Sequence, residues 1–142
     1  MKKLSIITLV AGLLFLAASC GTMKQVATAK NALAHTWVFT KDGKDVMGCN
    51  IKKPISIRFS EDKVNGYSGC NSFFGPYKIS KNHQIKLGPL GSTMMACVGD
   101  ECGKVEVGFI RDLDLVNKFK YSDKHLSLFH DDQLLLQFRQ AD

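Results

Sequence analysis

The sequence lacks the features that mark fibrous, disordered or multi-spanning proteins. Only 3 of its 142 residues are proline and 12 are glycine, which excludes a collagen-like repeat and a low-complexity chain. No second long apolar run follows the one near the N-terminus, so a bundle of transmembrane helices is excluded as well. The remaining composition, 45% hydrophobic and 23% charged, is typical of one ordinary globular domain.

Sequence signatures of the common enzyme classes are also absent. The chain has no phosphate-binding loop, no G-x-S-x-G nucleophile elbow and no dinucleotide-binding fingerprint. The acidic pairs Glu61-Asp62 and Asp131-Asp132 fall in predicted turns, where acidic residues are ordinary. The cysteines lack the paired C-x2-C spacing of structural zinc sites, and no histidine stands at a spacing that supports thiol catalysis. We therefore expect a non-catalytic protein that holds no metal and no cofactor.

The first twenty residues read as an export signal. A basic start at residues 1–3 precedes an uncharged run over residues 4–16, which is shorter than the roughly 20 residues that a spanning helix needs. The small residues 17–19 then stand directly before Cys20. This arrangement resembles the lipobox of bacterial lipoproteins, although Ala17 occupies the position where that family usually has leucine. The alternative is an ordinary cleaved signal with an incidental cysteine.

The lipobox resemblance implies that residues 1–19 form a cleaved signal peptide and that Cys20 is acylated and holds the protein to a membrane. Gly21 after it implies, in the Gram-negative sorting scheme, a location at the outer membrane facing the periplasm. We expect residues 20–34 to be anchor and tether, with some helical tendency, and residues 35–142 to form the domain. Cleavage leaves 17 basic and 13 acidic residues, a net charge of +4, which does not predict a nucleic-acid groove.

Four further cysteines remain in a chain that is expected to enter an oxidising space: Cys49, Cys70, Cys97 and Cys102. An even number of cysteines in an exported protein indicates disulfide bonds. Four cysteines permit three connectivities, among which the sequence alone does not choose. A bridge closing the loop 70–97 or the loop 49–102 stabilises the folded state by roughly 3.5 to 4 kcal/mol in the chain-entropy model.

Short apolar stretches separated by turn residues predict seven or eight strands. Ile57 and Phe59 alternate with Arg58 and Ser60, which is the two-residue period of a half-buried strand. Similar stretches occur at residues 35–40, 64–67, 77–79, 85–87, 125–130 and 133–139.

Helical spacing occurs in one segment, residues 103–118, where four apolar side chains share a face: Phe109, Ile110, Leu113 and Val116. Asp100 or Glu101 is placed to serve the N-terminus of this helix. We predict an α+β fold, a strongly curved, barrel-like antiparallel sheet with one helix packed on it. An OB-type barrel fits the same order of elements.

The most distinctive stretches are residues 64–77, VNGYSGCNSFFGPY, and residues 87–97, LGPLGSTMMAC. Their pattern, G-C-N-x-F-x-G-x-Y and then G-x-x-x-S-T-x-M-A-C, resembles the META domain of HslJ-like bacterial lipoproteins. The resemblance covers about residues 35–140. The motif residues that carry it are Gly69, Cys70, Asn71, Phe73, Gly75, Tyr77, Ser92, Thr93, Met95, Ala96 and Cys97.

The two motifs lead to expectations about the cysteines and the turns. Cys70 and Cys97 each lie in one motif, so the resemblance favours them as neighbours and leaves Cys49 with Cys102. Gly66 and Gly69 are expected at positive backbone angles or at close approaches of the chain. We expect Gly75-Pro76 to bend its strand and Phe73, Tyr77 and Ile79 to point into the core. Asn71 and Thr93 are expected to satisfy backbone amides. Met94-Met95 is expected to place one side chain in the core and one at the rim rather than to form a contact surface.

The resemblance implies a non-catalytic envelope lipoprotein that acts as an interaction module in heat or envelope stress or in drug tolerance, with an envelope protein as partner. The alternative is a carrier or pilot that holds an acyl chain between its sheet and its helix. A carrier needs an unfilled apolar cavity. A pure interaction domain fills its interior with its own aromatic side chains, which here are Trp37, Phe59, Phe73, Tyr77 and Phe109.

Overall fold

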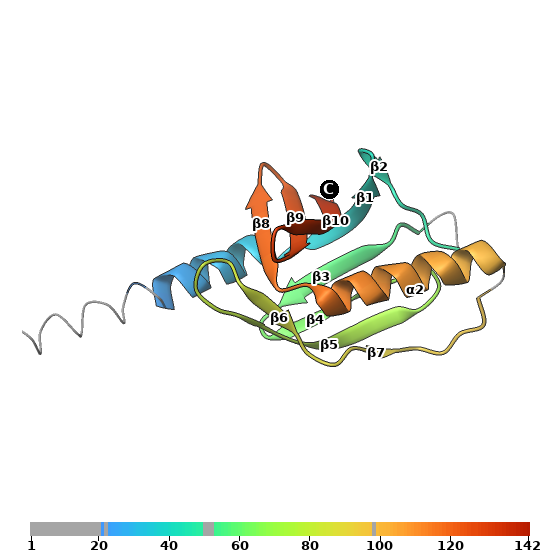
Figure 1. The fold of residues 1–142 in the computed structure, drawn as a ribbon, viewed down its shortest axis with the longest axis horizontal. Coiled ribbons are helices and arrows are strands. Elements are labelled where there is room, and N and C mark those ends of the chain that lie inside the picture. Colours follow the sequence, from blue (N-terminus) through green and yellow to red (C-terminus); the bar gives the residue numbers. More distant parts are fainter. Residues whose placement is uncertain (1–20, 22, 50–52, 98) are drawn as a thin grey trace, which may run out of the picture.

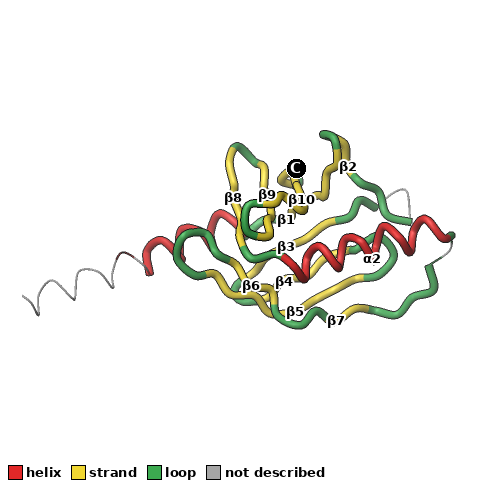
Figure 2. The backbone as a smooth tube through the Cα atoms, viewed as in Figure 1, coloured by secondary structure: helices red, strands yellow, loops and turns green. Residues whose placement is uncertain are grey.

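The computed structural model describes residue 21 and residues 23–49, 53–97 and 99–142 (Figures 1 and 2). The predicted signal segment and Cys20 lie outside the described residues. Among the described residues, no helix has the length and apolarity needed to cross a membrane. The elements are a helix over residues 23–33, β1 (Thr36–Lys41), β2 (Lys44–Asp45), β3 (Ser56–Ser60), β4 (Lys63–Tyr67), β5 (Ser72–Ile79), β6 (Ile85–Leu87), β7 (Gly91–Ser92), α2 (Asp100–Leu115), β8 (Lys118–Ser122), β9 (His125–His130) and β10 (Gln133–Gln140).

The strands form one antiparallel sheet that curls into a nearly closed barrel. Eight strands follow the order β6-β5-β4-β3-β1-β10-β9-β8, while the two-residue strands β2 and β7 pair with β1 and β5. The two ends of this path meet, because Phe119 N donates to His83 O over 3.0 Å and Ile85 N donates to Asn117 O over 3.1 Å. We call this junction of β6 and β8 the seam. The predicted α+β class and barrel-like sheet are confirmed.

The alternation read in the sequence decides which side chains fill the barrel. Ile57 and Phe59 on β3 are buried, whereas Arg58 and Ser60 between and after them are exposed. Gly66 on β4 packs so closely that an added Cβ would lie 2.6 Å from the Phe73 ring, which explains the glycine.

The Gly75-Pro76 pair interrupts the ladder on one side of β5 only. Toward β4 the pairing runs through both residues, with Lys63 opposite Pro76. On the other side β5 changes partner, from β7 at Phe73–Phe74 to β6 at Tyr77–Ile79. Because proline has no amide hydrogen to donate, a ladder tends to break at this residue, and the sheet changes edge strand here.

Helix α2 lies across strands β3 to β5, as Figure 1 shows. Its Phe109 ring contacts the rings of Phe39, Phe73 and Phe138, with centroids 5.2, 6.0 and 6.2 Å away. The helix begins and ends three residues earlier than the predicted segment 103–118. At its end Val116 is extended and the next amide, Asn117 N, donates to Phe129 O over 2.9 Å, so strand pairing takes over.

At its start α2 follows Gly99, which has a φ of 95° and occupies the N-cap position without a side chain. The side chain of Asp100, one of the two residues predicted to serve this terminus, is not among those that the structure describes. Glu101 in the first turn still interacts favourably with the positive end of the helix.

The segment predicted to be a tether is part of the folded domain. Residues 23–33 form a helix, drawn in blue in Figure 1, whose Ala29 and Leu33 are buried in the same core cluster as the barrel residues. Trp37 Nε1 donates to Leu33 O over 3.1 Å, and Lys30 forms an ion pair with Asp62. Only two residues of this helix, Ala29 and Leu33, are buried. The rest of the segment has the composition of a solvent-exposed linker, which is why the sequence predicts a tether.

Candidate functional site

The two sequence motifs meet at one end of the barrel, around the side chain of Asn71. Its Oδ1 accepts hydrogen bonds from Met95 N over 2.7 Å and from Thr93 Oγ1 over 2.9 Å. Thr93 Oγ1 in turn accepts from Ser72 N over 3.1 Å. The expectation that Asn71 and Thr93 satisfy backbone amides of the crossing loops is therefore confirmed. We call Ser68, Asn71, Thr93 and Glu106 the motif network.

Glu106 on α2 completes this network from the helix side. Its carboxylate accepts from Asn71 N over 2.7 Å, from Asn71 Nδ2 over 2.9 Å and from Ser68 Oγ. Burial raises the pKa of Glu106, but the hydrogen bonds donated by Ser68 and Asn71 outweigh burial, so the pKa lies below its ordinary value. The carboxylate is thus ionised at neutral pH and acts as a fixed acceptor.

Glu106 is a site residue that the sequence motifs do not include. The signal was present, because Glu106 stands three and seven residues before Phe109 and Leu113 and so shares their buried helix face. A charged residue on such a face needs a partner. Asn71, which supplies it, lies 35 residues away and is brought near by the barrel.

Both disulfide bonds lie beside this network and join the segments expected from the motifs. Cys70 pairs with Cys97 and Cys49 pairs with Cys102, with Cα–Cα distances of 5.7 and 5.4 Å. Cys97 Sγ lies 3.4 Å from a carboxylate oxygen of Glu106. These three groups, Cys70, Cys97 and Glu106, have metal-ligating atoms within 4.8 Å of one another. The disulfide occupies both sulfurs, so the cluster offers no thiolate in this state.

The remaining motif residues serve the backbone or the core. Gly69 has a φ of 125°, a region that favours glycine, and an added Cβ on Gly75 would lie 2.8 Å from Pro89 O. Phe73 and Tyr77 are buried, as predicted, while Ile79 is half-buried against the core. Ser92 Oγ donates to Thr93 O over 3.0 Å, and Ala96 is exposed.

The prediction for Met94-Met95 is wrong. Met94 is 99% exposed and Met95 is 64% exposed, so neither side chain reaches the core. The backbone amide of Met95 is held by Asn71, and the next cysteine is held by its bridge to Cys70, which leaves both methionine side chains facing solvent. We call residues 93–97 the methionine loop.

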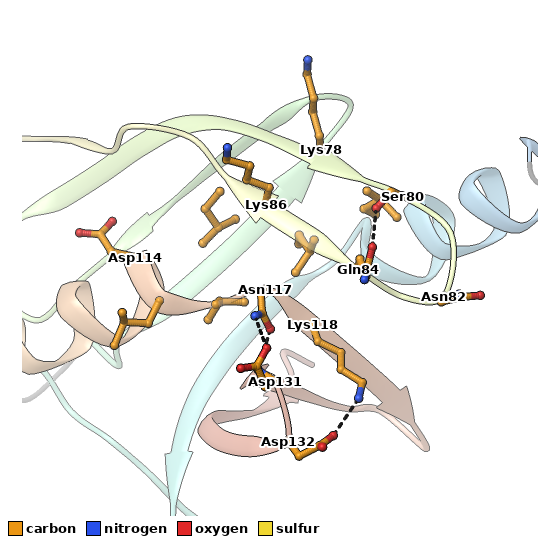
Figure 3. Close-up of a pocket in the computed structure, with 15 residues that line it drawn as sticks. Lys78, Ser80, Asn82, Gln84, Lys86, Asp114, Asn117, Lys118, Asp131 and Asp132 are labelled. Carbon is orange, nitrogen blue, oxygen red and sulfur yellow. Dashed lines mark hydrogen bonds and ion pairs between the residues drawn. The ribbon is translucent and has the colours of Figure 1, made fainter.

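A second feature is an open cleft of about 820 Å³ beside the seam, drawn in Figure 3. Charged side chains surround the cleft, and two of its carboxylates have partners. Asp131 accepts a hydrogen bond from Asn117 Nδ2 over 2.8 Å, and Asp132 forms an ion pair with Lys118 over 3.0 Å. The apolar residues of its lining are Ile79, Ile85, Leu87, Leu115 and Val116.

The comparisons with known proteins agree with this geometry. The model of the META domain family matches residues 30–142. An NMR structure of a protein from Burkholderia xenovorans is 25% identical, with a TM-score of 0.63 over 80% of this chain and 87% of that one. A second NMR structure is 26% identical, with a TM-score of 0.59 over 78% and 92% of the two chains.

A crystal structure of a DUF4847 family protein from Bacteroides vulgatus shares the fold at 14% identity, with a TM-score of 0.50 over 78% of this chain and 96% of that chain. No curated protein matches the chain. The family match begins at residue 30, inside the helix of residues 23–33, and takes in both motifs, both disulfides and Glu106. The chain belongs to the META domain family.

Proposed function

We propose that this protein is a non-catalytic lipoprotein of the cell envelope, anchored at the outer membrane through an acylated Cys20. Its META domain binds another envelope protein through the methionine loop. By family resemblance, the setting of this binding is heat or envelope stress, or tolerance of a hydrophobic antibiotic. The anchor rests on the lipobox pattern at residues 17–20.

The observation that carries the binding role is the fixed exposure of Met94 and Met95. Methionine is unbranched and polarisable, and it is frequent on surfaces that adapt to several partners. The loop around the two side chains is held by Asn71, Thr93 and the Cys70–Cys97 bridge. Binding through a loop that is already ordered loses less conformational entropy than binding through a mobile one.

The packing of the barrel supports surface binding rather than transport of a ligand inside the domain. All five aromatic side chains expected to fill the interior are at most 3% exposed. The carrier alternative would have to use the cleft beside the seam, whose apolar lining residues Ile85 and Val116 are themselves only 3% and 5% exposed. Lipid that co-purifies in a fixed ratio with the unacylated domain, and that binds again after the domain is delipidated and refolded, would favour the carrier.

Site-specific photo-crosslinking in intact envelopes tests the binding role. We expect a photoreactive amino acid at position 94 to give a discrete crosslinked protein, and Met95→Ser in the same chain to reduce its yield. Position 134 is the matched control, because Leu134 is 45% exposed on β10, outside the motif network. Equal crosslinking from positions 94 and 134 would contradict the proposal.

The anchor has its own test. Mass spectrometry of the purified mature protein should find a chain that begins at Cys20 and carries acyl groups, while Cys20→Ser should make the protein extractable from membranes by high salt, which does not extract the acylated protein. A mature chain that begins elsewhere and is unmodified would rule out the anchor without affecting the test of the methionine loop.

A further inference from the structure

Strands β3 to β6 present a cationic outer surface. From Lys63 to Gly99 the chain contains four lysines and no acidic residue. These lysines and Arg58 are exposed, and none of the five takes part in an ion pair within the described part of the chain. Elsewhere in the domain some cations, such as Lys30 and Arg139, are paired with carboxylates, whereas others, such as Lys41, form no ion pair within the described residues.

The register of the sheet places four of these cations on one face. Arg58 lies opposite Asn65, Lys63 opposite Pro76, and Lys78 directly opposite Lys86. Successive residues alternate between the two faces of a strand, and the inward face is already taken by the buried core residues. We call Arg58, Lys63, Lys78 and Lys86 the cationic face.

The pairing of Lys78 with Lys86 is unfavourable for the isolated domain. Like charges directly opposite on neighbouring antiparallel strands repel and destabilise the sheet. Figure 3 shows both side chains extending to the same side of the β5–β6 pair. Among the cleft residues, Asp131 and Asp132 already have partners in Asn117 and Lys118, and Asp114 forms no ion pair with either lysine. Asp62 also attracts Lys78 but is already paired with Lys30, so an anionic ligand would still relieve this repulsion.

The same face also carries apolar groups at its surface. Phe74, opposite Asn65, is 59% exposed, and Pro76 is exposed beside it. Cations on the same face as an exposed aromatic side chain match a membrane interface, where the ring enters the headgroup layer and the charged groups meet anionic lipid.

The N-terminal helix, which follows the proposed anchor in the sequence, is tied to the edge of this face. Lys30 in the N-terminal helix pairs with Asp62, the residue before Lys63, and Asp62 O accepts from Tyr77 N over 2.9 Å. Cys20 stands ten residues before Lys30 in the sequence, and ten residues of chain span at most about 35 Å. An acyl anchor at that distance would keep the face within reach of the membrane surface.

We propose that the cationic face binds the anionic phospholipid headgroups of the membrane to which the protein is anchored. This inference rests on the proposed function for the anchor. It adds an orientation: the outer surface of β3 to β6 faces the membrane.

Vesicle co-sedimentation of the unacylated chain 21–142 tests the face separately from the anchor. This chain contains every buried residue of the core, which runs from Ala29 to Phe138, so it includes the whole folded domain. We expect it to bind vesicles of phosphatidylcholine mixed with phosphatidylglycerol, to release at high salt, and to bind pure phosphatidylcholine far more weakly.

A matched pair of double variants decides the site. A lysine near an anionic surface strengthens binding about fivefold, so Lys78→Gln with Lys86→Gln should weaken vesicle binding about 25-fold. Lys41→Gln with Lys44→Gln removes another exposed, directly opposed lysine pair and should change binding less than about twofold. Thermal unfolding of both variants checks that they fold.

Equal loss in the two variants, or no preference for anionic vesicles, would overturn the proposal. Binding to polyglutamate without binding to anionic vesicles would assign the face to an acidic protein and would overturn it too. An unmodified Cys20 found by mass spectrometry, together with binding lost only in the Lys78/Lys86 variant, would refute the anchor and retain the face.

Discussion

Asn71 grips the carboxylate of Glu106 with both of its amides, the main-chain N–H over 2.7 Å and the side-chain Nδ2 over 2.9 Å. The same side chain accepts from Met95 N through its oxygen. One residue therefore joins the turn before β5, helix α2 and the methionine loop. Each predicted effect of a change at this end of the barrel depends on that junction.

Replacement of Asn71 by alanine should lower the free energy of unfolding by about 3 kcal/mol, because the partly buried carboxylate of Glu106 loses its Nδ2 donor and the Met95 amide loses its acceptor. Urea denaturation under oxidising conditions measures the change. Asn65→Ala is the control, since Asn65 is exposed on β4 and forms no side-chain hydrogen bond within the described residues; it should change stability by less than about 0.5 kcal/mol. Similar losses in the two variants would contradict a special role for Asn71.

The carboxylate of Glu106 should make the protein less stable in acid. Its folded pKa lies below the ordinary value of 4.5, so its contribution to stability is fully present above that pH and is lost as the pH falls through the folded pKa. Denaturation midpoints measured between neutral and acidic pH should fall, and Glu106→Gln should flatten the fall while lowering stability at neutral pH by roughly 2 kcal/mol.

Two other carboxylates, Asp45 and Asp62, also have pKa values below the ordinary value and so also stabilise the fold less in acid. Hydrogen bonds from Arg139 and Lys30 lower the pKa values of Asp45 and Asp62, so some acid sensitivity should persist in the Glu106 variant. Glu101→Gln, which removes an exposed carboxylate of α2, is the matched control and should change the pH profile much less than Glu106→Gln, because exposed ion pairs contribute little to stability. A Glu106→Gln profile that coincides with wild type would refute the assignment.

Removal of either disulfide should lower the free energy of unfolding of the domain. The chain-entropy model gives roughly 3.5 kcal/mol for Cys70→Ser with Cys97→Ser and about 4 kcal/mol for Cys49→Ser with Cys102→Ser. Thermal unfolding with and without reductant measures both effects. A wild-type midpoint that reductant leaves unchanged would show that the bridges are absent in solution.

Leu33→Ala should lower the free energy of unfolding by about 3 kcal/mol, because Leu33 is fully buried against the barrel. Asn31→Ala changes an exposed position on the same helix and should cost less than about 0.5 kcal/mol. Equal stability of the two variants would mean that the N-terminal helix does not belong to the cooperative core.

The features that follow from local periodicity were predictable. Ile57 and Phe59 alternate with exposed residues, and Phe109 and Leu113 are buried one turn apart, so the patterns indicate the correct faces before any partner is known. The curled sheet follows from the number of short strands and the need to bury one face of each.

The features that depend on distant partners were not predictable. The end of α2 is set by pairing of Asn117 with β9, and the docking of residues 23–33 is set by the barrel residues that receive Leu33. The same holds for Met94 and Met95, because a buried and an exposed methionine have the same local sequence pattern. Their exposure depends on where Asn71 holds the chain.

The seam gives the barrel an unequal resistance to opening. Both covalent cross-links lie at the end where α2 begins, whereas β6 and β8 are joined by main-chain hydrogen bonds around one isolated bridge, Gln84 with Lys118. The first turn of the N-terminal helix lies beside the seam, where Gly21 lines a hollow with His83 and Tyr121. We expect the domain to open first at the seam, where no disulfide joins the strands, and to stay folded at the end that the two disulfides hold.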